Sequence, residues 1–123
     1  MASKILIIED EKDLCEVMGE KLKKKGYEVF QAFNGADGLQ IAVQMRPDLI
    51  LLDILLPDMN GLLVLERLRE YDWGRKIKVI ILSAYGHEDK QEKAMELGAY
   101  DYLVKTEVNI DEVARRVMQA IGQ

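Results

Sequence analysis

The segment LILLDILLPDMNG, residues 49–61, contains the most apolar strand candidate of the chain, and a carboxylate ends that strand. Four consecutive apolar residues, 49–52, are typical of a parallel strand that is buried on both faces of a sheet. A carboxylate is costly to remove from water, so Asp53 at the end of such a strand needs a compensating partner or ligand. The residues that share its position in the fold indicate what that ligand is.

Short apolar runs alternate with amphipathic stretches along the whole chain. Strands are expected at residues 5–8, 29–33, 49–52, 79–82 and 102–104. Five successive βα units predict an α/β fold, in which a parallel sheet has helices on both faces. The sheet is wound in two directions from a central strand because such crossovers are right-handed. No linker or shift in composition divides the chain, so we expect one domain over residues 1–123.

Between the strands and after the last one, apolar residues recur every three or four positions, as they do in helices. The first two of these patterns include Val17 and Val43. The last helix is expected to begin after Asn109, because Glu112 follows three positions later at the spacing of a capping box.

The composition is that of a globular domain: 123 residues, of which 49% are hydrophobic and 32% charged. The net charge of −5 argues against nucleic acid as a direct ligand. The single cysteine, Cys15, excludes an internal disulfide and favours a reducing compartment. The N-terminal apolar run is too short for a signal peptide, and no segment approaches a membrane span, so we expect a cytoplasmic protein without a membrane partner.

Polar residues follow four of the five predicted strands: Glu9, Asp10 and Glu11 the first, Asp53 the third, Ser83 the fourth and Lys105 the fifth. The carboxyl ends of parallel strands meet at one edge of the sheet, where folds of this class bind their ligands. Each residue alone has an ordinary explanation as a helix cap, a loop residue or a surface lysine. Their joint placement indicates a shared ligand.

Acids that converge at this edge repel one another and therefore require a cation. Only oxygen donors are nearby, which favours Mg²⁺, Mn²⁺ or Ca²⁺ over zinc, and two carboxylates with several water ligands are typical of Mg²⁺. Ser83 and Lys105 offer a hydroxyl and a cation that suit the oxygens of a phosphoryl group. The pattern therefore predicts that Asp53 is a nucleophile fixed beside a metal ion that receives phosphoryl oxygens.

The segments that carry these residues are ILIIEDEKD (5–13), PDLILLDILLPDMNG (47–61), VIILSA (79–84) and GAYDYLVK (98–105). In this order and at this spacing, they resemble the receiver domain of two-component response regulators over essentially the full chain. The resemblance implies a flavodoxin-like fold, which is a doubly wound, five-stranded parallel sheet of strand order 2-1-3-4-5 with five helices.

The resemblance also implies a role for each residue at the edge of the sheet. Asp53 would be the phosphoacceptor, and it would take a phosphoryl group from a phosphohistidine on a histidine kinase or a phosphotransfer protein. The ligands of Mg²⁺, which Mn²⁺ could replace, would be Asp10, Asp53, Glu9 through a water molecule, and the backbone carbonyl of Leu55. The residues that bind the phosphoryl group or respond to it would be Ser83, Ala84, Lys105 and Tyr102.

A protein of this kind is a signalling component, which would catalyse only its own phosphorylation and dephosphorylation. Phosphorylation would draw Ser83 toward the phosphoryl group and let Tyr102 turn inward. The surface of the fourth helix, fifth strand and fifth helix would thereby switch toward a downstream partner or an output domain. The resemblance leaves open the cognate kinase, the output and dimerisation on phosphorylation.

Two features of the chain bear on how the site works. The family usually has a proline after the lysine of the fifth strand, but here Thr106 follows Lys105. A cis peptide bond before a residue other than proline costs about 3 kcal/mol, so we expect a trans bond and a different loop. Leu55 and Tyr85 occupy positions whose side chains commonly control the access of water to the acyl phosphate. Both are bulky, so we expect a long-lived phosphorylated state.

Three other functions fit the sequence less well. A Mg²⁺-dependent phosphatase with an aspartyl nucleophile has a second acid two residues after the nucleophile, where this chain has Leu55. A flavin or nucleotide carrier needs a Gly- or Ser/Thr-rich loop after the first strand, and the acidic EDEKD (9–13) would repel phosphate. A receiver-like binding module that is not phosphorylated is supported only by Thr106.

Overall fold

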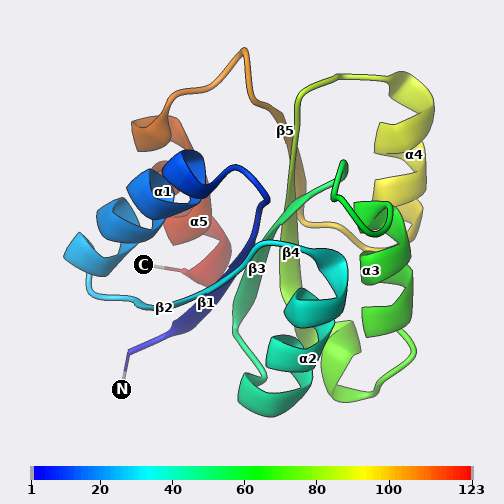
Figure 1. The fold of residues 1–123 in the computed structure, drawn as a ribbon, viewed down its shortest axis with the longest axis horizontal. Helices are drawn as coiled ribbons and strands as arrows, with labels where there is room; N and C mark the ends of the chain where they lie inside the picture. The colour runs from blue at the N-terminus through cyan, green and yellow to red at the C-terminus, as the bar shows by residue number, and fades with distance from the viewer. Residues whose placement is uncertain (1, 123) are drawn as a thin grey trace.

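The chain folds around a parallel β-sheet of strand order β2-β1-β3-β4-β5 (Figure 1). The structure, a computed structural model, describes residues 2–122. Its strands are β1 (Lys4–Ile8), β2 (Glu28–Ala32), β3 (Leu49–Asp53), β4 (Lys78–Ser83) and β5 (Asp101–Val104). Its helices are α1 (Lys12–Lys24), α2 (Gly35–Met45), α3 (Gly61–Leu68), the short 3₁₀ helix η1 (Trp73–Lys76), α4 (Glu88–Glu96) and α5 (Ile110–Ile121). The predicted flavodoxin-like fold and strand order are confirmed.

The central strand β1 places two loops of the chain at one point of the sheet edge. It pairs with β2 on one side and with β3 on the other. The chain therefore leaves the carboxyl ends of β1 and β3 in opposite directions, which makes this the switch point where such sheets bind ligands. Because Ile8 is opposite Leu52, the residues that follow them are neighbours at this edge.

Successive side chains of each strand point to opposite faces of the sheet, so alternate residues enter two separate hydrophobic cores. Ile7 and Leu51 pack on one face with α1 and α5, and Ile50 and Leu52 pack on the other face with α2, α3 and α4 (Figure 1). All five residues of β3 are buried. This double burial explains why residues 49–52 form a continuous apolar run.

Two apolar residues from the predicted helical patterns, Val17 and Val43, are exposed to solvent. The exposed fraction of Val17 is 52% and that of Val43 is 43%. Helix α1 contacts the sheet mainly through Cys15, Met18 and Leu22, which are three and four residues apart and share one stripe. Val17 lies beside that stripe, on the part of the helix surface that faces solvent.

Asn109 caps the start of α5 as predicted, but the side chain of Glu112 does not complete a reciprocal capping box. The side chain of Asn109 accepts a hydrogen bond from the backbone N–H of Glu112 at 2.8 Å. The carboxylate of Glu112 pairs with Arg115 and Arg116. Asn109 is therefore an ordinary N-cap, and Glu112 belongs to an ion-pair network on the surface of α5.

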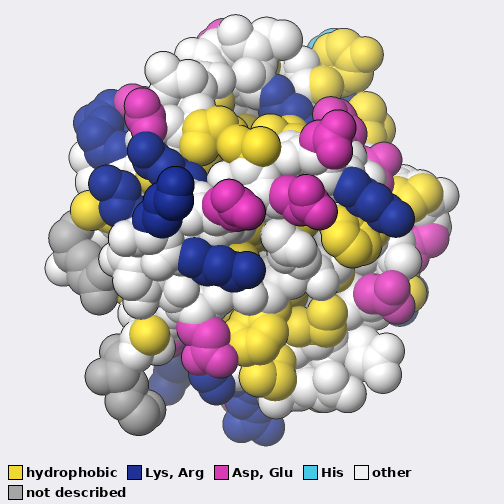
Figure 2. All heavy atoms as spheres, turned by 60° about the vertical axis from the view of Figure 1, so that its left-hand side comes forward, with side chains coloured by type: hydrophobic (Ala, Val, Ile, Leu, Met, Phe, Trp, Pro, Cys, Tyr) yellow, Lys and Arg dark blue, Asp and Glu magenta, His cyan; other side chains and the backbone are white. Residues whose placement is uncertain are grey.

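Charged side chains of both signs are mixed over the side of the molecule that carries α1 and α5 (Figure 2). Lys21 of α1 forms an ion pair with Asp111 of α5 at 2.6 Å, which links the two helices across this surface. Within residues 2–122, no helix is both long enough and apolar enough to cross a lipid bilayer.

Candidate functional site

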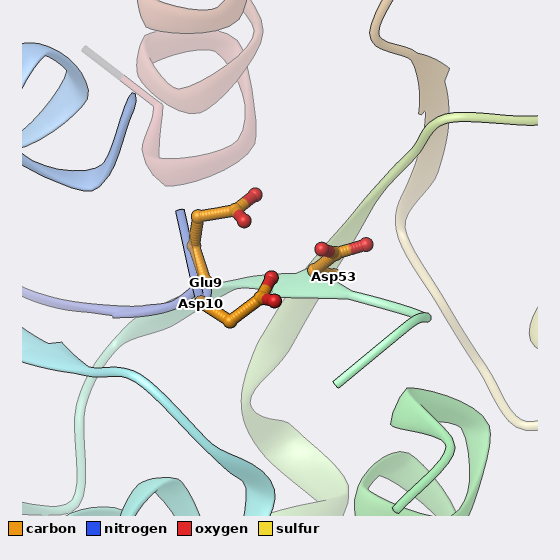
Figure 3. Close-up of side chains that lie close together, drawn as sticks. All are labelled: Glu9, Asp10 and Asp53. Carbon is orange, nitrogen blue, oxygen red and sulfur yellow. The ribbon is translucent and has the colours of Figure 1, made fainter. Parts of the chain in front are cut away.

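Three acidic side chains meet at the carboxyl edge of the sheet. Glu9 and Asp10 directly follow β1, and Asp53 is the last residue of β3 (Figure 3). One carboxylate oxygen from each lies within 4.8 Å of the others. The pairing of β1 with β3 brings them together, as predicted from the strand ends. Glu9 and Asp53 are buried, whereas Asp10 is exposed.

Lys105 is the cation of this site. It follows β5, and its Nζ lies 2.7 Å from Glu9 Oε1, 3.2 Å from Asp53 Oδ2 and 3.6 Å from Glu11 Oε1. Its backbone N–H donates to the carbonyl of Ser83 at 2.7 Å, which ties the start of the β5–α5 loop to the end of β4. The side chain thus reaches past the end of β4 to the carboxylates of β1 and β3.

Burial perturbs the ionisation of both enclosed acids. It raises the pKa of Glu9 from 4.5 to about 7, with the charge of Asp53 adding to the rise and Lys105 opposing it. Burial likewise raises the pKa of Asp53, again against the attraction of Lys105. Burial alone would lower the pKa of Lys105, but its contacts with Glu9 and Asp53 raise it. One lysine does not balance the carboxylates, so the site keeps an excess of negative charge.

The two oxygens of the buried Glu9 carboxylate have different surroundings. Glu9 Oε2 accepts from the backbone N–H of Glu11 at 3.0 Å, but Glu9 Oε1 is buried without a hydrogen-bond partner. This oxygen forms the 2.7 Å ion pair with Lys105 Nζ. A buried carboxylate oxygen that accepts no hydrogen bond is uncommon, and an additional cation or a water molecule would satisfy it.

The backbone after Asp53 is closed into a tight loop. The backbone N–H of Leu55 donates to Asp53 Oδ1 at 3.3 Å, and that of Gly61 donates to the carbonyl of Ile54 at 2.6 Å. Leu55 also forms an isolated antiparallel bridge with Asn60. A Cβ atom at position 61 would collide with the carbonyl oxygen of Asp53, so the loop can close this tightly only with glycine there.

Two hydrogen bonds link Ser83 to Tyr102 through the backbone of Tyr85. Ser83 is buried, and its Oγ accepts from the backbone N–H of Tyr85 at 3.2 Å. The carbonyl of Tyr85 accepts from the hydroxyl of Tyr102 at 2.9 Å. Ala84 lies between Ser83 and Tyr85. The peptide bond between Lys105 and Thr106 is trans, as predicted.

Glu11 occupies the N-cap position of α1, and its Oε1 also lies 3.6 Å from Lys105 Nζ. One residue whose loop adjoins the site, Asp58, was not predicted from the sequence. Asp58 lies in the β3–α3 loop and binds the start of α2. No sequence pattern relates Asp58 to Gly35 and Ala36, because they are 23 and 22 residues away and meet it only through the tertiary fold.

Known proteins share both the fold and this arrangement of segments. Residues 5–118 match the family described as the response regulator receiver domain. The sporulation initiation phosphotransferase F of Bacillus subtilis (strain 168) is 41% identical over 113 residues, which are 92% of this chain and 89% of that protein. The DNA-binding dual master transcriptional regulator RpaA of Synechocystis sp. is 38% identical over 114 residues, which are 93% of this chain and 47% of that protein.

A solved structure of a receiver domain protein also resembles this chain over nearly its full length. The CheY-like response regulator receiver domain protein of Methanospirillum hungatei JF-1 has a TM-score of 0.89 and 28% identity, over 97% of this chain and 93% of that one. The family match includes every residue of the site, from Glu9 to Lys105. The chain therefore belongs to the response regulator receiver domains of two-component signalling systems.

Proposed function

We propose that this receiver domain, over residues 1–123, accepts a phosphoryl group on Asp53 in a reaction that depends on Mg²⁺. The donor is a phosphohistidine on a histidine kinase or on a phosphotransfer protein. The observation that carries the proposal is the convergence of three carboxylates and one lysine at the carboxyl edge of the sheet. Phosphotransfer is also the activity named for the Bacillus subtilis relative.

The donor set of the site fits a divalent cation that prefers oxygen. The cluster consists of carboxylates, and the buried Oε1 of Glu9 lacks a hydrogen-bond partner. Asp10 and Asp53 would bind Mg²⁺ or Mn²⁺ directly, Glu9 through a water molecule, and Leu55 through its backbone carbonyl. When bound, the cation supplies positive charge to the phosphoryl oxygens and offsets the repulsion among the acids.

The chain's own residues account for the transfer step. An oxygen of Asp53 attacks phosphorus, and the new O–P bond forms as the N–P bond of the phosphohistidine breaks. The electron pair of that bond stays on the imidazole nitrogen of the donor. Lys105 and the hydroxyl of Ser83 bind phosphoryl oxygens, and the small side chain of Ala84 leaves room for them. The chain catalyses only this reaction on itself and the later hydrolysis.

The contacts of Tyr85 suggest how phosphorylation reaches the surface. When the hydroxyl of Ser83 turns to a phosphoryl oxygen, it releases the backbone N–H of Tyr85. The carbonyl of the same residue holds the hydroxyl of Tyr102, so the shift frees Tyr102 to change rotamer. This exchange reshapes the surface of α4, β5 and α5, where a downstream protein, an output domain or a second copy of the chain binds.

Acetyl phosphate and intact-mass spectrometry test the proposal directly. With Mg²⁺ present, the mass should increase by one phosphoryl group, and hydroxylamine should remove that group as expected for an acyl phosphate. The modification should be absent in Asp53→Asn and in samples that contain EDTA. A modification that persists in Asp53→Asn, or none in the wild-type protein with Mg²⁺, contradicts the assignment.

A further inference from the structure

Asp58 connects the loop of the acidic site to a helix that contributes none of the site residues. It lies three residues after Leu55, in the loop between β3 and α3. Its Oδ1 accepts a hydrogen bond from the backbone N–H of Gly35 at 2.8 Å, and its Oδ2 accepts one from Ala36 at 2.9 Å. Both donors belong to the first turn of α2.

The first turn of α2 has a second cap that does not involve the loop. Asn34 is the N-cap, and its Oδ1 accepts from the backbone N–H of Asp37 at 2.8 Å. Between them, Asn34 and Asp58 accept hydrogen bonds from the backbone N–H groups of the first three residues of the helix. The same backbone N–H groups hold the pKa of Asp58 below its usual value, so the carboxylate stays charged at neutral pH.

The residue after Asp58 also rests on the start of α2. A Cβ atom at Gly35 would collide with the side chain of Met59, so the loop packs against the helix where glycine leaves space. At the other side of the loop, Leu55 is held by its N–H contact with Asp53 and by its bridge to Asn60. The path of the backbone around Leu55 is therefore fixed at one end by β3 and at the other by α2.

We propose that Asp58 is a positioning residue for the metal site, because it fastens the 55–60 loop to α2 and thereby fixes the carbonyl of Leu55. The inference rests on the proposed function, in which that carbonyl is a ligand of Mg²⁺. Outer contacts that orient metal ligands commonly change metal affinity by about tenfold or more. Asp58 thus acts on Mg²⁺ through the backbone and without contact with the ion.

Asp58→Ala and Asn34→Ala form a matched pair, because each removes one cap from the same turn of α2. Both variants should lower the urea midpoint of unfolding. Only Asp58→Ala should weaken Mg²⁺ binding, by about tenfold in calorimetric titration. Hydrogen exchange should become faster at Gly35, Ala36 and Leu55 in Asp58→Ala. Asp58→Asn keeps an acceptor for one of the two N–H groups, so its affinity for Mg²⁺ should lie between those of Asp58→Ala and the wild type. This variant replaces Asp58→Ala in the test if the alanine variant does not fold.

The outcomes separate this inference from the proposed function. Wild-type protein that binds no Mg²⁺ overturns the proposed function and, with it, the inference. Wild-type protein that binds Mg²⁺, together with unchanged affinity in Asp58→Ala and Asp58→Asn, overturns the inference alone. Equal losses of affinity in Asp58→Ala and Asn34→Ala also overturn it, because the effect would then come from the stability of α2. A loss confined to the Asp58 variants supports it.

Discussion

The metal-free protein should be more stable at pH 6 than at pH 8, because the buried carboxyl group of Glu9 is easier to keep neutral than charged. The pKa of this group rises from 4.5 to about 7 on folding, mainly through burial. Between these two values the folded protein holds a proton that the unfolded chain has released. Stability therefore increases as the pH falls through 7 and continues to increase toward 4.5.

The size of the effect follows from this shift. Each pH unit between the two pKa values changes the free energy of unfolding by about 1.4 kcal/mol. Above pH 7, Glu9 is mostly ionised in the folded protein too, so the free energy of unfolding changes little there. The change between pH 8 and pH 6 therefore comes mainly from the unit below pH 7 and amounts to about 1 kcal/mol. The pKa of Asp53 is also raised, so it acts in the same direction. Lys105, whose pKa is raised from 10.5, stays charged throughout this interval.

Urea unfolding in EDTA at pH 6, 7 and 8 measures the effect. The measurement uses the His87→Gln background, which removes the only histidine of the chain. In that background, Glu9→Gln should reduce the dependence on pH, because the group that binds the proton is gone. Saturating Mg²⁺ should also reduce it, since a bound cation favours the charged carboxylates. Metal-free protein that is equally or more stable at pH 8 would refute the reasoning, as would an unchanged slope in Glu9→Gln.

Four further outcomes follow from other parts of the structure. Arg69 donates to four backbone carbonyls near η1 and the end of α4, so Arg69→Met should lower the free energy of unfolding by about 3 kcal/mol in urea titrations. Burial, with help from Glu9 and Glu16, raises the pKa of Cys15 to about 11, so its thiol should resist a disulfide reagent at pH 8 until urea unfolds the protein. Lys105→Met should bind Mg²⁺ more tightly than wild type in calorimetry but be phosphorylated more slowly by acetyl phosphate, and weaker binding would contradict the ionic contacts described. The acyl phosphate should survive for minutes or longer in radiolabel decay if the bulky side chains of Leu55 and Tyr85 restrict water as the resemblance implies, and hydrolysis within seconds would argue against this.

The sheet and the acidic cluster were predictable because both depend on rules that act between neighbouring elements. Residues 49–52 had to be a strand covered on both faces, and a chain of βα units with right-handed crossovers places its strands in parallel. The carboxyl ends of adjacent parallel strands then meet. The sequence alone therefore predicts that Glu9 and Asp53 lie close together, and one carboxylate oxygen of each lies within 4.8 Å of the other.

The exposure of Val17 and the position of Asp58 were not predictable by the same reasoning. Helical periodicity identifies a stripe of apolar residues but not its width, which depends on how α1 crosses the sheet and where α5 packs beside it. Val17 lies outside the part that is covered. Asp58 binds N–H groups that belong to a different βα unit, and no local pattern encodes a contact that only the three-dimensional fold creates.

The position of Lys105 changes how the metal-free site should be understood. The sequence assigns this lysine to the phosphoryl group, whereas the structure places its ammonium between Glu9 and Asp53. One cation cannot pair with both carboxylates and also turn fully to a phosphoryl oxygen. A divalent ion among the acids would take over their charge and leave Lys105 free for the phosphoryl group. The dependence on Mg²⁺ would then have two causes: the ion offsets negative charge, and it releases the lysine that the reaction needs.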